Sequence, residues 1–292
     1  MTTRPTTGST TEPSAGAAAP RRLSDVDALR GFALWAILLV NITFMASAYR
    51  DTGVDDPAFG SASDTTVRFL TGVFFEAKFY LLFSFLFGYS FTLQLDSAAR
   101  DDAAFLPRFL RRCASLFILG LCHAVLLFPG DILTTYAVLG LVLLAVHRIR
   151  PRTAVRAAAV LFTVTAVGYL ILAWALAAAG GGGIDPAAVT EQGRQATEAL
   201  HGDTGSVIGA HLRQLPDVVF MLAFFQAPAA FLLGLAAGKR GVLTDLARHT
   251  PFLRRLQWTG FTAGIAGGLV WAHASQGHAG RRTNWWRWPS MW

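Results

Sequence analysis

The sequence predicts an all-α, polytopic transmembrane helix bundle of about seven spans with a cytoplasmic N-terminus. Three observations lead to this fold class. Of the 292 residues, 53% are hydrophobic and only 15% are charged, a balance typical of integral membrane proteins. The hydrophobic residues gather in segments, most of them long enough to cross about 30 Å of hydrocarbon. Most of the 25 Lys and Arg residues fall in the connections on one side of these segments, which the positive-inside rule makes cytoplasmic.

The expected spans follow one another along the chain. The second is overlong and is interrupted at Glu76, so an interfacial helix followed by a crossing from Lys78 is an alternative reading. The fourth is the shortest. The seven segments are 29–48, 69–95, 108–128, 132–146, 153–178, 218–237 and 256–274.

The chain divides into three parts. Residues 1–21 are rich in Thr, Ser, Pro, Gly and Ala, so they are expected to form a disordered cytoplasmic tail. Residues 22–274 form the transmembrane domain, with an external loop over 180–216 that holds a short polar helix at 186–200. Residues 275–292 carry a cluster of Trp and Arg unlike the rest of the chain, and we expect a truncated or frameshifted ending here.

A polar stripe runs along the first span. Arg30 and Asn41 are eleven positions apart, which places them within about 20° of the same helix face and about 16 Å apart along the axis. A polar stripe cannot face lipid cheaply, so it should line the protein interior or a water-filled cavity. The pair Asp27 and Arg30 either anchors this span at the headgroups or receives an anionic ligand from the cytoplasm.

Further polar residues are expected in the outer half of the bundle. Lys78 begins the second crossing, His123 lies near the outer end of the third span, and Asp131 and Tyr136 begin the fourth. Together with Asn41 they could activate a hydroxyl or amine and stabilise an oxyanion.

Each of these residues also has a plain structural explanation. Lys78 could extend its ammonium group toward the membrane surface. His123 could be a hydrogen-bonded packing residue, and Asp131, which follows Pro129-Gly130, is a natural helix N-cap. No metal-ligand cluster or phosphate-binding glycine loop is present in the sequence, and the basic connections explain the net charge of +7 without a nucleic-acid partner.

Three ordered motifs resemble the YeiB-like family of bacterial inner-membrane proteins, which carries a domain of unknown function (number 418). The resemblance covers residues 22–271 and is weakest in the external loop. The motifs are Asp27-Ala-Leu-Arg-Gly-Phe-Ala-Leu with Ile37-Leu-Leu-Val-Asn-Ile, then Lys78-Phe-Tyr-Leu-Leu-Phe-Ser-Phe-Leu-Phe-Gly, then Gly120-Leu-Cys-His with Pro129-Gly-Asp-Ile-Leu and Tyr136-Ala.

That family is similar in its first span to transmembrane acyltransferases such as heparan-alpha-glucosaminide N-acetyltransferase, which share an Arg-Gly at this position. Bacterial sugar O-acyltransferases carry a His where this chain has Asn41, so His123 is the candidate base. The resemblance implies a multi-pass protein of the bacterial inner membrane that moves an acyl group from cytoplasmic acyl-CoA to a sugar or lipid acceptor reached from outside.

On this hypothesis each polar group has a role. Arg30, with Asp27, binds the anionic donor. Asn41 and Lys78 orient the acyl carbonyl, and His123 with Asp131 acts as the general base. The sequence leaves two alternatives open: a small-solute or lipid transporter that uses the same stripe as its path, and a membrane assembly partner without catalysis.

Overall fold

The computed structural model describes residues 24–49, 56–76, 78–100, 104–178, 186–224 and 226–276. These residues form ten helices and no strand, which confirms the all-α prediction. The helices are α1 (Ser24–Ala46), α2 (Ala62–Phe74), α3 (Lys78–Arg100), α4 (Phe105–Leu126), α5 (Leu133–Val146), α6 (Pro151–Ala178), α7 (Pro186–Leu200), α8 (Thr204–Phe224), α9 (Ala227–Lys239) and α10 (Leu246–Gln276).

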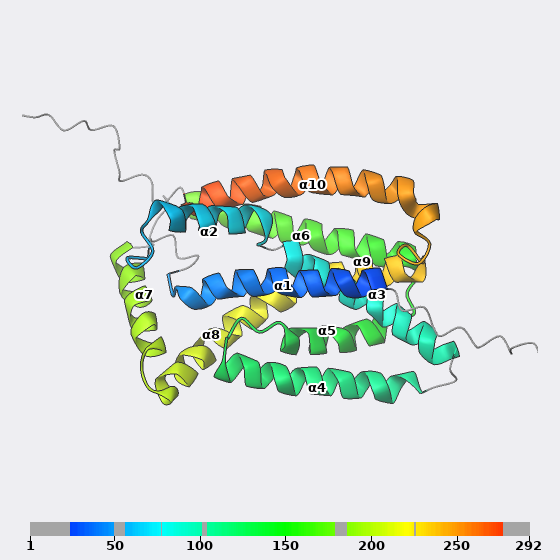
Figure 1. Ribbon diagram of the computed structural model, residues 1–292, viewed down its shortest axis with the longest axis horizontal. Helices are drawn as coiled ribbons and strands as arrows, with labels where there is room; N and C mark the ends of the chain where they lie inside the picture. Colours follow the sequence, from blue (N-terminus) through cyan, green and yellow to red (C-terminus); the bar gives the residue numbers. More distant parts are fainter. Residues whose placement is uncertain are drawn as a thin grey trace, which may run out of the picture.

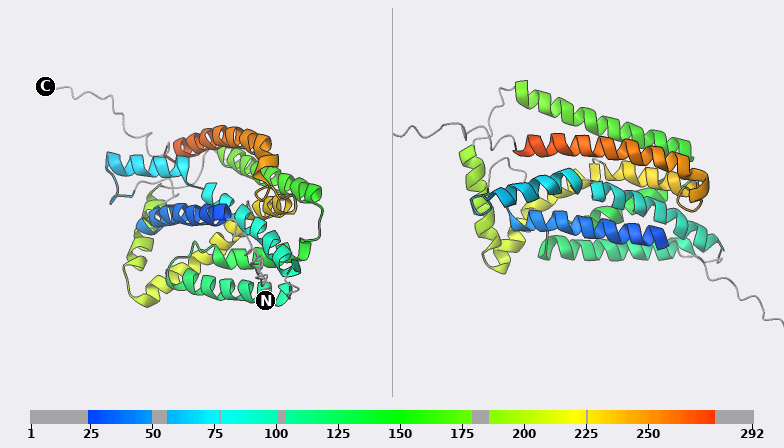
Figure 2. Two further views of the ribbon diagram at one scale, coloured as in Figure 1. Left: turned by 45° about the vertical axis from the view of Figure 1, so that its right-hand side comes forward. Right: turned by 45° about the horizontal axis from the view of Figure 1, so that its top comes forward.

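Four long helices share one direction. In Figure 1, α1, α4, α6 and α10 all begin at the right and run to the left, while α7 lies across the left-hand end. In every view α10 and α4 lie on opposite sides of the molecule, with α3 and α9 between them (Figure 2). We call the end where α1 and α4 begin the basic end, because Arg30, Arg108 and Lys239 lie there, and the opposite end the α7 end.

The helix pair α3 and α9 forms the centre of the bundle, and glycines bring its two backbones together. A Cβ atom built on Gly234 would lie 2.1 Å from the carbonyl oxygen of Phe85, and one on Gly88 would lie 2.2 Å from that of Phe231. The Phe87 and Phe231 rings stack beside this contact, 4.8 Å apart. Small residues of this kind permit the close helix packing that stabilises bundles in lipid, where the hydrophobic effect between helices is absent.

A small polar network lies inside this apolar centre. The hydroxyl of Tyr136 on α5 is 2.6 Å from the Ser84 hydroxyl and donates to the Tyr80 carbonyl oxygen at 3.2 Å. Ser84 donates to the same carbonyl at 2.9 Å. Because an unpaired polar group would be costly here, these bonds tie α5 to the first turn of α3.

Two of the seven expected spans are broken into pairs of helices. Residues 69–95 divide into α2 and α3, and α2 runs along the bundle beside α10 rather than flat across its end (Figure 1). Residues 218–237 divide into α8 and α9 at Gln226. The break after α2 agrees with the alternative of a helix followed by a crossing from Lys78, whereas the division of 218–237 was not expected. Pro228, near the start of α9, has no N–H with which to continue a helix from α8.

Within the described residues, four stretches are long and apolar enough to cross a membrane: Val26–Ala46, Ala62–Arg100, Phe105–Leu126 and Pro151–Leu172. Ala62–Arg100 includes the break between α2 and α3. Large apolar side chains on their outer faces are open to the surroundings, and Trp174 on α6 is 73% exposed. A soluble protein would not expose this much contiguous apolar surface, so the helices suggest a membrane protein.

The expected polar helix at 186–200 is confirmed as α7. The segment that follows is not a loop up to residue 216, because α8 already begins at Thr204 and continues through Pro216. The N-terminal tail expected at 1–21 lies outside the described residues. So does the atypical ending, apart from the two residues that complete α10.

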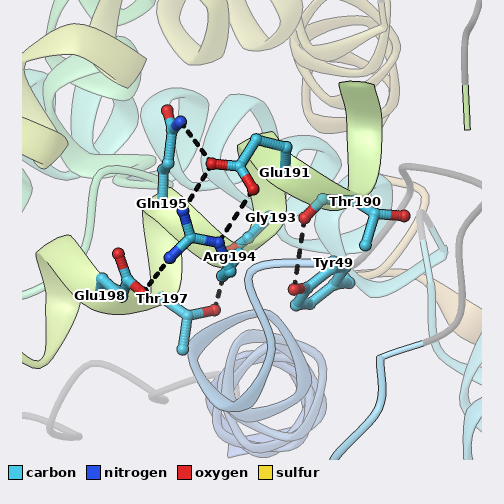
Figure 3. Close-up of polar contacts among 8 residues, drawn as sticks. All are labelled: Tyr49, Thr190, Glu191, Gly193, Arg194, Gln195, Thr197 and Glu198. Atoms are coloured by element: carbon cyan, nitrogen blue, oxygen red, sulfur yellow. Dashed lines mark hydrogen bonds and ion pairs between the residues drawn. The ribbon is translucent and has the colours of Figure 1, made fainter. Parts of the chain in front are cut away.

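Helix α7 is seated on the chain that leaves α1. The Tyr49 ring packs against Gly193, where a Cβ atom would lie 2.4 Å from it, and the Tyr49 hydroxyl donates to the Thr190 carbonyl oxygen at 3.4 Å (Figure 3). On its exposed side Arg194 bridges Glu191 and Glu198. The guanidinium group of Arg194 holds the pKa of Glu191 down, at about 2. Since i,i+3 and i,i+4 ion pairs stabilise a helix locally, α7 has its own support.

Candidate functional site

The polar stripe of α1 lies at the edge of its buried face. Ala33, one turn after Arg30, is fully buried, whereas Leu34 beside it is 50% exposed, and Arg30 and Asn41 are half-buried. This arrangement follows from the eleven-residue spacing of Arg30 and Asn41, which returns to the same side of the helix after three turns.

At the basic end, Arg30 makes two contacts. It pairs with Asp27 one turn earlier, and it donates to the hydroxyl of Ser90 on α3. Arg112 on α4 approaches from the other side, with its guanidinium carbon 5.1 Å from the centre of the Phe87 ring and its charge near that of Arg30. Ser90 and Arg112 were not among the site residues expected from the sequence. One available signal is that Arg112 lies eleven positions before His123, the same spacing as Arg30 and Asn41.

Toward the α7 end, His123 and Asp131 come together. The Nδ1 atom of His123 lies 3.2 Å from Oδ1 of Asp131, and the two side chains are 35% and 2% exposed. The other carboxylate oxygen of Asp131 accepts the Thr134 N–H at 2.8 Å, so Asp131 also caps α5. Gly120 makes room for this contact, because its Cβ atom would lie 2.7 Å from Oδ2 of Asp131.

Polar atoms around this pair have spare hydrogen-bonding capacity. Although they are close, His123 Nδ1 and Asp131 Oδ1 are not aligned as a hydrogen bond. In the same part of α5 the Thr134 and Thr135 hydroxyls also have no described partner. Buried polar groups are normally paired, so a cluster of unpaired ones at a half-exposed histidine is typical of a site that binds a ligand.

A second histidine, His211 of α8, contacts the same end of α4 and was not expected from the sequence. It is buried, and its Nδ1 atom lies 3.0 Å from the Val125 carbonyl oxygen. Since a carbonyl oxygen only accepts, Nδ1 is the donor in this contact. The available signal for His211 was its position within an apolar stretch of the sequence. It was missed because it lies in the segment 180–216, which was expected to be an external loop.

Lys78 lies elsewhere. Its ammonium group is 3.5 Å from the Gly72 carbonyl oxygen at the end of α2, and its side chain packs beside Gly264 and Gly268 of α10. Helix α10 lies on the opposite side of the molecule from α4 (Figure 2), so Lys78 is not gathered with His123. The break after α2 turns Lys78 toward α10, so it does not lie in one cluster with His123.

The remaining expected residues also lie apart from the pair. Tyr136 points into the core network with Ser84 rather than toward His123. Among the described residues, no hydrogen bond joins Asn41 to His123 or Asp131. The searched part of the chain also contains no group of three His, Cys, Asp or Glu residues that could hold a metal ion.

The chain is similar to two uncharacterized Bacillus proteins. It is 29% identical over 273 residues to the uncharacterized protein YxaH of Bacillus subtilis (strain 168), a match that covers 86% of this chain and 66% of that protein. It is 42% identical over 129 residues to an uncharacterized 39.9 kDa protein in the amylase 3'region of Bacillus acidopullulyticus, covering 44% of this chain and 35% of the relative.

The chain thus spans just under two thirds of one relative and about a third of the other. No family model matches the sequence, and no solved structure is similar to it. Because both relatives are uncharacterized, the similarity carries no activity to this chain, and any functional argument depends on its own residues.

Proposed function

We propose that the chain is an acyltransferase-like protein of the bacterial inner membrane, in the YeiB-like family, with its basic end on the cytoplasmic side. The orientation is supported by the Lys and Arg residues at that end. Each of the broken pairs α2–α3 and α8–α9 makes one crossing, which gives seven crossings in all.

The observation that carries the proposal is the pair formed by His123 and the buried Asp131. In this proposal Asp131 orients the imidazole through Nδ1, and Nε2 accepts the proton of an acceptor hydroxyl as that oxygen attacks the acyl carbonyl. The carboxylate then stabilises the imidazolium that forms. When the C–S bond of the thioester donor breaks, the imidazolium returns its proton to the departing thiolate, so the ester and the free thiol are the products. The half-exposed ring at the α7 end is open to an acceptor from outside, and a sugar or lipid hydroxyl fits this chemistry.

The donor side follows from the geometry of α4. Arg112 and His123 are eleven residues apart on this helix, so they lie about 16 Å apart along the axis and within about 20° of one face. A thioester donor such as acyl-CoA separates its phosphates from its acyl group by a flexible arm, and this spacing suits such a molecule. The phosphates would lie at the basic end and the thioester near His123.

Asn41 is the group of α1 that fits beside the acyl carbonyl. The guanidinium charges of Arg30 and Arg112 lie near one another, and α1 and α4 run in the same direction (Figure 1). Eleven residues later on each helix, Asn41 and His123 therefore lie at a similar depth. Its amide could donate to the carbonyl oxygen of the donor. Lys78 is left out of the mechanism because it packs on α10.

Transfer from labelled acetyl-CoA tests this proposal directly. The purified protein, reconstituted in liposomes, would be offered acetyl-CoA labelled in the acetyl group together with sugar and lipid acceptors. We expect labelled product with the wild type and a loss of roughly 10²-fold or more with His123→Gln. His201→Gln, a histidine between α7 and α8, is the matched control and keeps the wild-type rate. Equal product from His123→Gln and wild type would overturn the proposal.

One observation favours a transporter as the second candidate. The two broken helix pairs meet inside the bundle, since Tyr80, in the first turn of α3, is hydrogen-bonded to the backbone of Ala227, the first residue of α9. Broken helices that meet near the middle of a bundle are typical of transporter binding sites. Solute flux through liposomes without any acyl donor would favour this candidate over the enzyme.

A further inference from the structure

We infer that Arg30 and Arg112, together with Ser90, form a binding site for a phosphate group at the basic end of the bundle. The inference deepens the proposed function by naming the charged group of the donor. It rests on that function only for the identity of the molecule that carries the phosphate. The geometry of the site is independent of the His123–Asp131 pair, which lies toward the other end.

Two helices contribute the cations over one face of a third. Phe87 and Ser90 are three residues apart on α3, so they lie on the same face of that helix. Arg30 of α1 donates to Ser90, and Arg112 of α4 lies over the Phe87 ring. The two guanidinium groups thus converge above this short stretch of α3, although α1 and α4 make little direct contact with each other.

The charge at this point is not balanced. Asp27 pairs with Arg30, but within the described residues no carboxylate pairs with Arg112. Two like charges held near one another repel, and the folded chain keeps them together without an intervening anion of its own. An external anion with several oxygens would remove this repulsion by accepting from both groups.

The side-chain chemistry suits a phosphate group. A guanidinium group stacked on an aromatic ring keeps its N–H edges free, and these edges match two oxygens of a phosphate in a bidentate contact. The guanidinium carbon of Arg112 lies over the Phe87 ring, 5.1 Å from its centre. Arg30 is held by Ser90, which is buried and itself donates to the Leu86 carbonyl oxygen. The cluster is therefore oriented before any ligand arrives.

The same phosphate chemistry could come from two sources at a cytoplasmic membrane surface. One is the pyrophosphate of a coenzyme A donor, as the proposed function requires. The other is the phosphodiester of an anionic phospholipid headgroup. Both would accept from the two guanidinium groups, and the experiment separates them by offering each alone.

The test is a binding titration with two probes and matched arginine variants. Coenzyme A without an acyl group is titrated into detergent-solubilised protein, and inorganic pyrophosphate is used as a competitor. Separately, the protein is placed in nanodiscs of phosphatidylglycerol or of phosphatidylcholine, and bound lipid is measured. Arg30→Gln and Arg112→Gln remove one cation each. Arg111→Gln removes the neighbouring exposed charge on α4 and serves as the control.

We expect saturable binding of coenzyme A that pyrophosphate displaces, weakened about tenfold or more by Arg112→Gln and by Arg30→Gln, and changed less than about twofold by Arg111→Gln. Retention of phosphatidylglycerol that Arg112→Gln abolishes, with no binding of coenzyme A, assigns the same site to a lipid headgroup. Equal losses in Arg111→Gln and Arg112→Gln, or no phosphate binding by a sample with a wild-type melting temperature, would overturn the inference.

The two proposals fail in different ways. His123→Gln leaves the phosphate site intact, so it should bind coenzyme A as the wild type does. Binding without transfer in the wild type would contradict the proposed function and leave the phosphate site standing. Transfer that is unaffected by Arg112→Gln and Arg30→Gln, at donor concentrations well below saturation, would overturn the site and leave the function standing.

Discussion

The Nδ1 atom of His123 lies 3.2 Å from Oδ1 of Asp131, while Oδ2 of the same carboxylate accepts the Thr134 N–H and so begins α5. One carboxylate thus connects the end of α4 to the start of α5. The sequence suggested an N-cap and a catalytic partner as alternative readings of Asp131, and the geometry allows both at once. The two roles can be separated by substitution.

Asp131→Asn should reduce acyl transfer without unfolding the protein. An Asn side chain still accepts the Thr134 N–H, because Asn and Asp are comparable N-caps, but it lacks the charge that stabilises the His123 imidazolium. We expect the transfer rate to fall about 10²-fold or more and the melting temperature to remain near that of the wild type. The measurement is initial transfer rate beside thermal unfolding followed by circular dichroism.

Asp131→Ala provides the contrast, because it also removes the cap. This variant should lose about 1 kcal/mol of stability in addition to the activity. If Asp131→Asn and Asp131→Ala keep the wild-type transfer rate, the carboxylate is only a helix cap.

Gly234→Ala should destabilise the bundle. Its Cβ atom would lie 2.1 Å from the Phe85 carbonyl oxygen and 2.7 Å from the Tyr89 nitrogen, both of them backbone atoms that cannot move aside. Overpacking of this kind costs roughly 1–3 kcal/mol. Gly260→Ala in α10, where nothing lies within 4 Å of the new Cβ, is the control and should be neutral or slightly stabilising. Thermal unfolding in detergent compares the two, and equal melting temperatures would contradict the packing described for α3 and α9.

Lys78→Met should lower stability and leave acyl transfer unchanged per folded molecule. The ammonium group lies near the carbonyl end of α2, close to the Gly72 oxygen, where a positive charge is worth roughly 0.3–1 kcal/mol and up to about 2 kcal/mol when partly buried. Met keeps the length of the stem between Gly264 and Gly268. A wild-type melting temperature combined with a large loss of transfer would instead return Lys78 to the catalytic mechanism.

Helix α7 should become less stable in acid. Arg194 lowers the pKa of Glu191 from 4.5 to about 2, so the ionised form is favoured in the folded helix. The contribution is fully present above about pH 4.5 and is lost as the pH falls from there to about 2. Hydrogen exchange of α7 amides should therefore be constant above pH 5, once corrected for intrinsic rates, and rise below it. Glu191→Gln should remove this pH dependence, and an unchanged profile would contradict the assignment.

The sequence predicts the helical fold and the positions of polar residues along the helices well, because both depend on local patterns. Apolar segments of spanning length and the alternation of basic connections are properties of contiguous residues. The helix at Pro186–Leu200 and the shared face of Arg30 and Asn41 follow from the same helical period. The His123–Asp131 contact also lies within reach of sequence reasoning, because only a short turn separates α4 from α5.

Contacts between distant segments were out of reach of these patterns. The turn of Lys78 toward α10 depends on the break after α2 and on the notch left by Gly264 and Gly268. The approach of Arg112 to Arg30 depends on how α1 and α4 are placed around α3. His211 was missed because α8 starts twelve residues before Pro216, the residue expected to end the loop.

The most direct test of the account measures donor binding and acyl transfer on the same preparations of wild type, Arg112→Gln and His123→Gln. The account predicts that the two substitutions separate these properties. Arg112→Gln should weaken acetyl-CoA binding about tenfold or more and still transfer at saturating donor, whereas His123→Gln should bind normally and fail to transfer. Normal transfer by His123→Gln, or no transfer by a well-folded wild type that binds acetyl-CoA, would contradict the account.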